Sequence, residues 1–586
     1  MVSLNSIDYE SRRLVGRRAF LMTALQVACM GFLSSKLVKL QFLDYDKYHN
    51  LADNNLHDDR IVRADRANIV DINNKILATN IANHRISYIG FPAEDTEQVL
   101  ITILQQLEVE PKQRAKILQK FRKKQKFIVA DNIKWEKFYK IYKYVTNRKD
   151  FQIETIPHRY YPYAEVAAHL LGYINRVDIE GVSGIEQMFD QQMFGVDGQR
   201  QVTRNASGRV MAEKLQKKPV INPSLQITLD IDLQQYAYGL LTQSNQAGSI
   251  TVIDINDNCA VRCIASNPAY DNNRFVNGFS HDEWQQLTNN GRAPFIFKPI
   301  QGQYAPGSTF KMIVALAGLE KKVINSRERI FCSNNLKIGN RRFYCWQKDG
   351  HGSMNLIRAI TNSCDVYFYE LANRMAIEDI MAMAHRFGLG QSHCFASIDE
   401  KIGILPDSKW KREKYDQEWI KGDTILAGIG QGYILTTPLQ LAVMTARVLT
   451  NRAVTPHIHK SQVVINDNQP KIVSDSLHNL MLRGMKAVMH NRKGTANYQR
   501  IRLNGPDMYG KTGTVQVRRI SKEERHSKGG VIKNEDLPWK MRDHALFVCG
   551  FPLKKPRYAI SVVIEHGGSG SKVATPMAIE IAKKLS

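Results

Sequence analysis

The stretch Ala305-Pro-Gly-Ser-Thr-Phe-Lys-Met312 places a hydroxyl and an amine three residues apart, where a loop is expected to become a helix. Its proline and glycine interrupt the preceding structure, and the apolar run at 312–319 predicts a buried helix. Ser308 and Lys311 would then share one helix face, a turn apart. A neutral lysine amine can take the proton of a serine hydroxyl, so this spacing indicates nucleophilic catalysis.

A lysine that accepts a proton near pH 7 must be neutral. The pKa of Lys311 would have to fall by about three units from its free value of ~10.4, a differential cost of about 4 kcal/mol. Burial against the apolar helix and a second nearby cation would both lower it. Because the same spacing occurs by chance on solvated helices, the alternative is a pair of ordinary polar side chains.

Two further stretches supply the missing partners. Asn362-Ser-Cys-Asp365 offers a second hydroxyl, and Tyr509-Gly-Lys-Thr-Gly-Thr-Val515 offers a cation, a hydroxyl and a backbone position without a side chain. The order Ser-x-x-Lys, Ser-x-Asp/Asn, Lys-Thr-Gly resembles the motif set of penicillin-binding proteins and serine β-lactamases. Three matches together favour catalysis over an accident of spacing.

The resemblance extends over most of the chain and is to the class B penicillin-binding proteins, in particular to their elongation-type members. Three stretches resemble the family's non-catalytic pedestal and two resemble its elongation-type enzymes; they are Arg159–Pro162, Ala167–Ile174 and Gly181–Glu186, then Gly428–Leu441 and Ile564–Gly568. Within the pedestal stretches, His169 and Glu186 are interpreted as hydrogen-bonded structural groups, not as catalytic ones.

Alternating apolar residues predict strands near both ends of the second half. Residues 249–254 and 261–265 predict a hairpin, 545–550 and 558–565 predict two further strands, and 576–585 predicts a closing helix. Strands at both ends of a helical middle give an α+β arrangement, an antiparallel sheet flanked by helices. The resemblance implies the same arrangement, that of the penicillin-recognising transpeptidase domain.

The resemblance implies a role for each residue of the three motifs. Ser308 would attack the carbonyl between two terminal D-alanines of a stem peptide, with Lys311 as base, directly or through Ser363. The backbone N–H groups of Ser308 and Thr514 would stabilise the oxyanion. The remaining site residues are Asp365, where many relatives have Asn, and Lys511, Thr512, Gly513 and Thr514 on an edge strand that would hold the substrate.

Length and charge limit the class of protein. The 586 residues exceed one ordinary core, and the formal net charge of +25 indicates an anionic surface or polymer as a neighbour. Neither a zinc-finger repeat nor an RNA-binding aromatic signature accompanies this charge, which disfavours nucleic acid as the partner. A membrane is the better match.

An apolar segment near the start predicts a membrane anchor. Residues 19–35 carry no charge, and 37–43 extend the run with a lysine that can snorkel. A cleaved signal peptide or a lipoprotein site at Cys29 is the alternative, but no Ala-x-Ala site follows and Gln26 stands where an aliphatic residue is expected. The arginines before the segment place the N-terminus in the cytoplasm by the positive-inside rule; they are Arg12, Arg13, Arg17 and Arg18.

The rest of the first half predicts a pedestal. Residues 60–78 predict strands joined by a turn at Asn73-Asn74, and 205–208 predict another turn. From 108 to 150, Lys, Arg, Phe and Tyr recur at helical spacing, which predicts a solvated amphipathic helical region. The predicted domains are a cytoplasmic tail at 1–18, an anchor at 19–43, a non-catalytic pedestal at 44–223 and a transpeptidase domain at 224–586.

Three of the eight cysteines fall in one short segment with a histidine. Cys332, Cys345, His351 and Cys364 would supply three thiolates and an imidazole, a tetrahedral set that suits zinc. The resemblance implies a structural metal in this loop, with aspartate at some of these positions in relatives. Such a site would position the second catalytic motif and would not activate water. Buried free thiols or one disulfide are the alternatives.

The sequence predicts a membrane-anchored D,D-transpeptidase that cross-links peptidoglycan stem peptides during cell elongation, with its catalytic domain on the periplasmic side of the bacterial inner membrane. The acyl transfer itself would need no cofactor. A carboxypeptidase or β-lactamase of the same fold, or a non-catalytic β-lactam sensor or scaffold, is the alternative. No glycan-polymerising domain is recognised before the pedestal, so a polytopic membrane glycan polymerase and other elongation-complex proteins are the expected partners.

Overall fold

The computed structural model describes residues 5–49, 57–90, 92–123, 125–146, 148–175, 179–204, 210–464, 469–527 and 530–586. The turn predicted at 205–208 lies outside these residues. Contacts divide the chain into two compact units, one formed by 1–66 with 194–222 and the other by 67–193 with 223–586.

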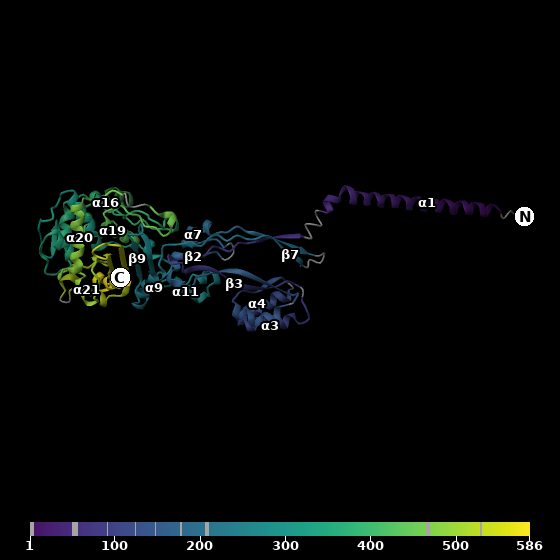
Figure 1. Cartoon of the computed structure of the whole chain (residues 1–586), viewed down its shortest axis with the longest axis horizontal. Coiled ribbons are helices and arrows are strands. Elements are labelled where there is room, and N and C mark those ends of the chain that lie inside the picture. Colours follow the sequence, from purple (N-terminus) through teal and green to yellow (C-terminus); the bar gives the residue numbers. More distant parts are fainter. Residues whose placement is uncertain are drawn as a thin grey trace. The chain divides into compact units, whose positions relative to one another are not determined.

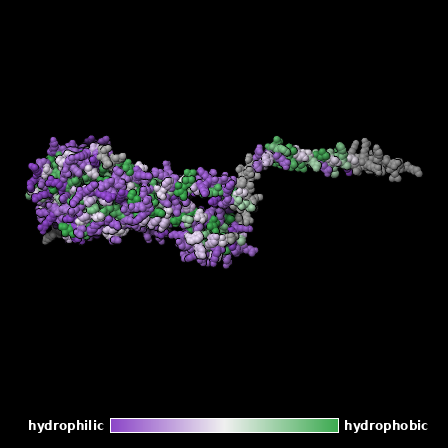
Figure 2. All heavy atoms as spheres, viewed as in Figure 1, coloured by the Kyte–Doolittle hydropathy of each residue, from purple (hydrophilic) through white to green (hydrophobic). Residues whose placement is uncertain are grey.

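The first unit contains a long helix and a small sheet. Helix α1 (Asn5–Val38) continues as the π-helical turn η1 (Lys39–Leu43). The segment Arg18–Leu43 is long and apolar enough to cross a membrane, and Figure 2 shows apolar side chains along it. The sheet is antiparallel in the order β1-β6-β7; its strands are β1 (His57–Val62), β6 (Gly198–Arg204) and β7 (Val210–Lys217).

The second unit begins with a sheet built around the long strand β3 (Ile76–Tyr88). The predicted turn at Asn73-Asn74 is confirmed, because Asn74 has a left-handed φ of 62° and the Asp71 N–H donates to the Lys75 carbonyl across the turn. The sheet has the order β4-β3-β2-β8, and β5 also pairs with β3. Its other strands are β2 (Ile69–Val70), β4 (Phe127–Ile133), β5 (Phe151–Tyr160) and β8 (Leu225–Gln226).

Three helices share a hydrophobic core with this sheet: α3 (Thr96–Gln106), α4 (Pro111–Arg122) and α5 (Trp135–Val145). The predicted helical region from 108 to 150 is therefore wrong at β4, which pairs with β3. The β4 segment carries no lysine or arginine and contains Phe, two Ile and Val, which pack well on a pleated sheet. The lysine-rich segments on either side form the predicted helices.

Short helices connect this sheet to the rest of the unit: η2 (Ala164–Val166), α6 (Ala168–Leu171), α7 (Gly184–Met188) and α8 (Asp190–Met193). The structural roles predicted for His169 and Glu186 are confirmed. Glu186 accepts a hydrogen bond from Arg159 at 2.8 Å, and both side chains are fully buried. His169 donates to the Pro294 carbonyl at 2.7 Å, and burial lowers its pKa to about 4.

The predicted antiparallel sheet of the catalytic half is confirmed, with the order β10-β9-β17-β16-β15. Ile560 and Val562 of β17 belong to one hydrophobic cluster and Ala559 belongs to another, so apolar side chains leave both faces of the sheet. The strands are β9 (Gly248–Asp254), β10 (Ala260–Asn267), β15 (Tyr509–Val515), β16 (His544–Phe551) and β17 (Tyr558–Ile564).

Helices cover this sheet, as Figure 1 shows around β9. Those that pack directly on its strands include α9 (Ile231–Gln243), α19 (Pro438–Thr450) and α23 (Thr575–Lys584). The predicted helical middle is also confirmed. Its helices include α11 (His281–Thr288), α12 (Lys298–Gln301), α13 (Lys311–Glu320), α14 (Leu356–Thr361), α15 (Asp365–Asn373), α16 (Ile377–Arg386), α17 (Ser408–Tyr415), α18 (Lys421–Ala427), α20 (Asp475–His490) and α21 (Asn497–Arg502).

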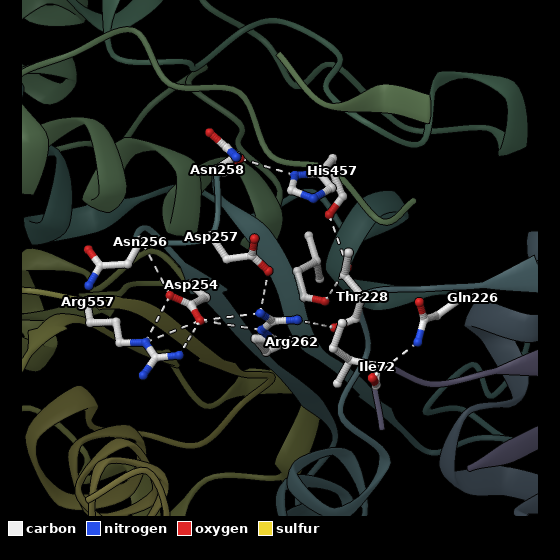
Figure 3. Close-up of polar contacts among 11 residues, drawn as sticks. Ile72, Gln226, Thr228, Asp254, Asn256, Asp257, Asn258, Arg262, His457 and Arg557 are labelled. Carbon is white, nitrogen blue, oxygen red and sulfur yellow. Dashed lines mark hydrogen bonds and ion pairs between the residues drawn. The ribbon is translucent and has the colours of Figure 1, made fainter. Parts of the chain in front are cut away.

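A polar network fastens the segment that leads into α9 to the catalytic sheet (Figure 3). Asp254, buried at the end of β9, lies 3.5 Å from the Arg262 guanidinium. Arg262 in turn donates to the Thr228 carbonyl at 3.1 Å. On the other side, the Gln226 side chain donates to the Ile72 carbonyl in the pedestal turn at 3.2 Å. The pedestal sheet and the catalytic sheet are thus joined through one short segment.

Candidate active site

The predicted nucleophile lies at a tight turn. Gly307 has a left-handed φ of 54° and opens the 3-10 turn η3 (Gly307–Phe310), which leads directly into the buried helix α13. A Cβ on Gly307 would approach Val515 Cγ2 to 2.9 Å, so the turn packs closely against β15. Ser308 is half-buried and Lys311 is fully buried. The turn therefore places a half-buried serine three residues before a fully buried lysine.

The second hydroxyl reaches this turn from a separate pair of helices. Ser363 lies between α14 and α15, is buried, and has a left-handed φ of 53°. Its Oγ accepts hydrogen bonds from Lys311 at 3.3 Å and from Lys511 at 3.0 Å. A left-handed non-glycine residue is strained, and such strain persists only where the surrounding structure holds it. All three sequence motifs therefore meet at one serine.

The two lysines have different partners. Lys311 donates to Asp365 Oδ1 at 2.7 Å and to the Ser363 carbonyl at 2.9 Å. Lys511 is held by Ser363 Oγ and by its neighbour's carbonyl at 3.1 Å. Burial and the charge of Lys311 lower the pKa of Lys511 well below its usual value, and Asp365 opposes this effect. The structure thus pairs Lys311 with a carboxylate and lowers the pKa of Lys511, an arrangement that the sequence did not predict.

Asp365 also connects the lysines to the cysteine-rich segment. Its second oxygen accepts from the Trp346 backbone N–H at 3.0 Å, and the Trp346 indole N–H donates to the Ser363 carbonyl at 3.1 Å. Burial raises the pKa of Asp365 above its usual value, although the charge of Lys311 opposes this effect. Sequence reasoning missed Trp346; its place directly after Cys345 was the available signal.

The third motif forms the edge of the catalytic sheet, as predicted. Among the described strands, β15 pairs with β16 alone. Thr514 is exposed, and its Oγ1 accepts from the Gly570 N–H at 3.2 Å. The hydroxyls of Thr512 and Thr495 lie 2.7 Å apart. An open edge of this kind can pair with an extended peptide. Sequence reasoning missed Thr495 and Gly570, because no motif or spacing pointed to them.

Gly513 makes room for the nucleophile turn. A Cβ at this position would lie 3.0 Å from Leu546 Cβ, 3.2 Å from Thr309 Cγ2 and 3.4 Å from the Pro306 carbonyl oxygen. The sequence predicts that the missing side chain admits a substrate backbone. In the structure, the turn that carries Ser308 takes up this space, so the glycine bears on the position of the nucleophile.

The four predicted metal ligands come together beside the second motif. Their ligand atoms lie within 4.8 Å of one another. His351 Nδ1 is 3.8 Å from Cys332 Sγ and 3.4 Å from Cys345 Sγ. Tetrahedral zinc with its usual bond lengths would separate sulfur and nitrogen ligands by about 3.6 Å. The fourth ligand, Cys364, directly follows Ser363, and all the thiols are free. The donor set and its spacing fit zinc.

Contacts within the cluster stabilise the charged forms of Cys345 and His351 and the neutral form of Cys364. Burial alone lowers the pKa of His351, but hydrogen bonds with Cys332 and Cys345 raise it to about 9. Hydrogen bonds from Cys332 and Cys364 lower the pKa of the Cys345 thiol, whereas Cys332 and Cys345 raise the pKa of Cys364. The cluster therefore favours a thiolate, the form in which cysteine binds metals.

Comparison with known proteins adds an independent finding. The family model "Penicillin binding protein transpeptidase domain" matches residues 248–584, and "Penicillin-binding Protein dimerisation domain" matches 61–226. The chain is 28% identical to peptidoglycan D,D-transpeptidase MrdA of Haemophilus influenzae, over 97% of this chain and 91% of that protein. It is 26% identical to the Escherichia coli protein of the same name, over 97% and 94%.

Solved structures agree with these matches. Penicillin-binding protein PBP2 of Helicobacter pylori, in complex with MreC, has a TM-score of 0.76 at 28% identity, over 90% of this chain and 98% of that one. Pseudomonas aeruginosa PBP2 in complex with WCK 5153 has a TM-score of 0.66 at 26% identity, over 90% and 96%. Because the transpeptidase model alone spans more than half of the sequence, and three motifs meet at one site, the chain belongs to the penicillin-binding proteins, in their PBP2 group.

Proposed function

We propose that this protein is a peptidoglycan D,D-transpeptidase that cross-links stem peptides through a serine acyl-enzyme during cell-wall elongation, and that β-lactams acylate the same serine. The observation that carries the proposal is the convergence of Lys311 and Lys511 on the Ser363 hydroxyl, beside the turn of Ser308. The name shared by the curated relatives supports the same reaction.

In the proposed acylation, Ser308 Oγ attacks the carbonyl carbon of the penultimate D-alanine. The sequence predicts Lys311 as the base, but Lys311 is paired with Asp365 at 2.7 Å. We therefore propose that the proton passes through Ser363 Oγ to the unprotonated form of Lys511, which lies 3.0 Å from that oxygen. The N–H groups of Ser308 and Thr514 would stabilise the oxyanion. Collapse of the intermediate breaks the peptide bond, and the proton returns through Ser363 to the departing D-alanine. An acceptor amine then attacks the ester and restores the serine.

The substrate is proposed to lie along β15. The exposed hydroxyl of Thr514 and the neighbouring Thr512 would hold its terminal carboxylate, and the strand edge would pair with its backbone. Lys511 is fully buried, and once it has accepted the proton its charge would act on the carboxylate through the wall of the site. The carboxylate of Asp365 would hold Lys311 in place through an ion pair at 2.7 Å.

Acylation is expected to slow as the pH falls through the pKa of Lys511. Below that pKa the amine is protonated and cannot accept the proton from Ser363. Asp365→Asn removes a carboxylate that raises this pKa, so the acid limb of the rate profile should move to lower pH. Rates of penicillin acylation measured across a pH series in both proteins test this. An acid limb that moves to higher pH in the variant would contradict the assignment.

We propose that the cluster of Cys332, Cys345, His351 and Cys364 holds a structural zinc ion. A bound zinc would supply a closed cross-link with no position left for a reactive water. Cys364 directly follows Ser363 in the chain. Cys345 directly precedes Trp346, which donates hydrogen bonds to the Ser363 carbonyl and to the Asp365 carboxylate. The cross-link would therefore position the second motif.

We infer that the chain is a single-pass protein of a bacterial inner membrane, with its N-terminus in the cytoplasm and its catalytic domain in the periplasm. The apolar segment Arg18–Leu43 supports this, together with the arginines before it. The proposed domains are a tail at 1–18, an anchor at 19–43, a pedestal at 44–223 and a transpeptidase domain at 224–586.

We infer that the enzyme works with a polytopic membrane glycan polymerase and with other proteins of the elongation complex. Both family models that match the chain describe penicillin-binding domains, and polymerisation is a different reaction. The related H. pylori protein was solved in complex with MreC, which supports the inference that this chain also binds a partner protein. Co-purification of a polymerase that persists after deletion of both anchor and pedestal would count against contacts through those regions.

Labelling with a fluorescent penicillin, followed by an assay of stem-peptide cross-linking, tests the proposed reaction. A transpeptidase binds the label covalently and forms peptide dimers. A carboxypeptidase or β-lactamase transfers the acyl group to water instead, and a sensor or scaffold gives no dimers. Absence of a covalent label on folded protein would rule out the acyl-enzyme.

A further inference from the structure

Helix α5 carries an exposed aromatic stripe beside the face that it packs into the core of the pedestal. Trp135, Tyr139 and Tyr142 recur at i, i+4 and i+7, so they lie on one face of the helix. Their side chains are 59%, 71% and 47% exposed. A different face holds the helix in the core through Phe138, Ile141 and Val145.

Basic side chains accompany this stripe. The segment 134–145 contains four lysines and one glutamate, a net charge of +3, and all four lysines are exposed: Lys134, Lys137, Lys140 and Lys143. The exposed pair between Lys137 and Glu108, at 3.2 Å, accounts for one of them. Helix α4, which shares the same core, also carries exposed basic residues; they are Lys112, Lys116, Lys120 and Arg122, of which Arg122 pairs with Glu97 at 3.3 Å. Helix α5 therefore combines exposed aromatic rings with an excess of positive charge.

We propose that this face of α5 docks on an anionic phospholipid surface. Trp and Tyr rings favour the boundary between headgroups and acyl chains, and lysines favour anionic headgroups. A helix with a basic polar side and exposed aromatic residues has the composition of interfacial membrane helices. An acidic protein could also match this charge, and aromatic rings occur at protein interfaces too, so the experiment below includes a soluble acidic polymer.

The proposed membrane anchor would make a weak contact of this kind effective. A small interfacial patch binds lipid only weakly by itself, and stable attachment normally needs two signals. A chain tethered through 18–43 would present α5 to the same bilayer at a high effective concentration. The docking thus rests on the proposed anchoring and is independent of the acyl-transfer chemistry. It would restrict the orientations of the pedestal at the membrane.

Hydrogen–deuterium exchange of the full chain in lipid nanodiscs tests the docking. The discs contain phosphatidylcholine alone or phosphatidylcholine with phosphatidylglycerol. The amides of α5 should exchange more slowly in the anionic discs, and added salt should remove this protection. Lys140→Glu combined with Lys143→Glu should lower the ratio of docked to free α5 by roughly 20-fold or more, because each basic residue near an anionic surface contributes about fivefold. Tyr139→Ser should also weaken docking, with no change of charge.

Lys554→Glu combined with Lys555→Glu is the matched control, because it makes the same charge change at exposed residues between β16 and β17. It should leave α5 protected. All these variants should keep normal penicillin acylation. If the unmodified chain itself is not acylated by penicillin, the proposed reaction is overturned, but the measurement of lipid docking remains valid. Equal protection in both kinds of disc, or protection that survives the double lysine substitution, would overturn the docking. Protection by soluble polyglutamate and not by anionic lipid would overturn it in favour of an acidic protein.

Discussion

Replacing Ser308 by alanine is expected to abolish covalent labelling by penicillin and to reduce peptide cross-linking by about 10⁴-fold or more. The reason is chemical, since no other atom of the chain is proposed to form the ester. Ser308 is half-buried in the turn η3 that precedes α13, outside the hydrophobic clusters. We therefore expect the free energy of unfolding to change by less than about 0.5 kcal/mol.

Intact-mass analysis after incubation with penicillin measures this effect directly. Ser363→Ala is the informative control, because it keeps the nucleophile and removes only the hydroxyl that Lys311 and Lys511 share. It should label slowly and still reach one adduct per chain. A stable adduct on the Ser308→Ala protein would contradict the assignment of Ser308 as the nucleophile.

Much of the catalytic fold could be predicted because its signals are local. Apolar alternation predicts β9, β16 and β17, and the apolar run after Lys311 predicts α13. The chemistry could be predicted because each motif keeps its residues within a few positions of one another. What brings the motifs together is not local: Ser363 and Lys511 are 148 residues apart in sequence yet 3.0 Å apart in space. Only the family resemblance linked them in advance.

The parts that sequence reasoning missed depend on contacts between distant segments. Strand β4 lies between lysine-rich helices and is defined by its pairing with β3. The different roles proposed for Lys311 and Lys511 depend on which of the two amines forms the ion pair with Asp365. Likewise, the role of Trp346 depends on how its loop folds back onto Ser363. Composition and spacing carry no information about these contacts.

Removing the metal ligands is the second change with a large expected effect. In Cys345→Ser combined with His351→Ala, the cluster loses two of its four ligands. Zinc binding at a site of this kind contributes on the order of 10 kcal/mol to ordering its loop. Without it, Cys364 and Trp346 would hold Ser363 and Asp365 less firmly. The variant should lose bound zinc, melt at a lower temperature and label more slowly with penicillin, although Ser308 is unchanged.

Elemental analysis of protein purified without chelators decides whether zinc is responsible. Cys259→Ser is the matched control, because it removes a buried thiol that is not part of the cluster. It should lower stability modestly and keep both the zinc and the acylation rate. If the unmodified protein instead contains much less than one zinc per chain and acylates normally, the four side chains are only buried polar groups. The position of Ser363 would then depend on its other contacts, among them those with Trp346 and the two lysines. The double ligand variant should in that case acylate at close to the normal rate.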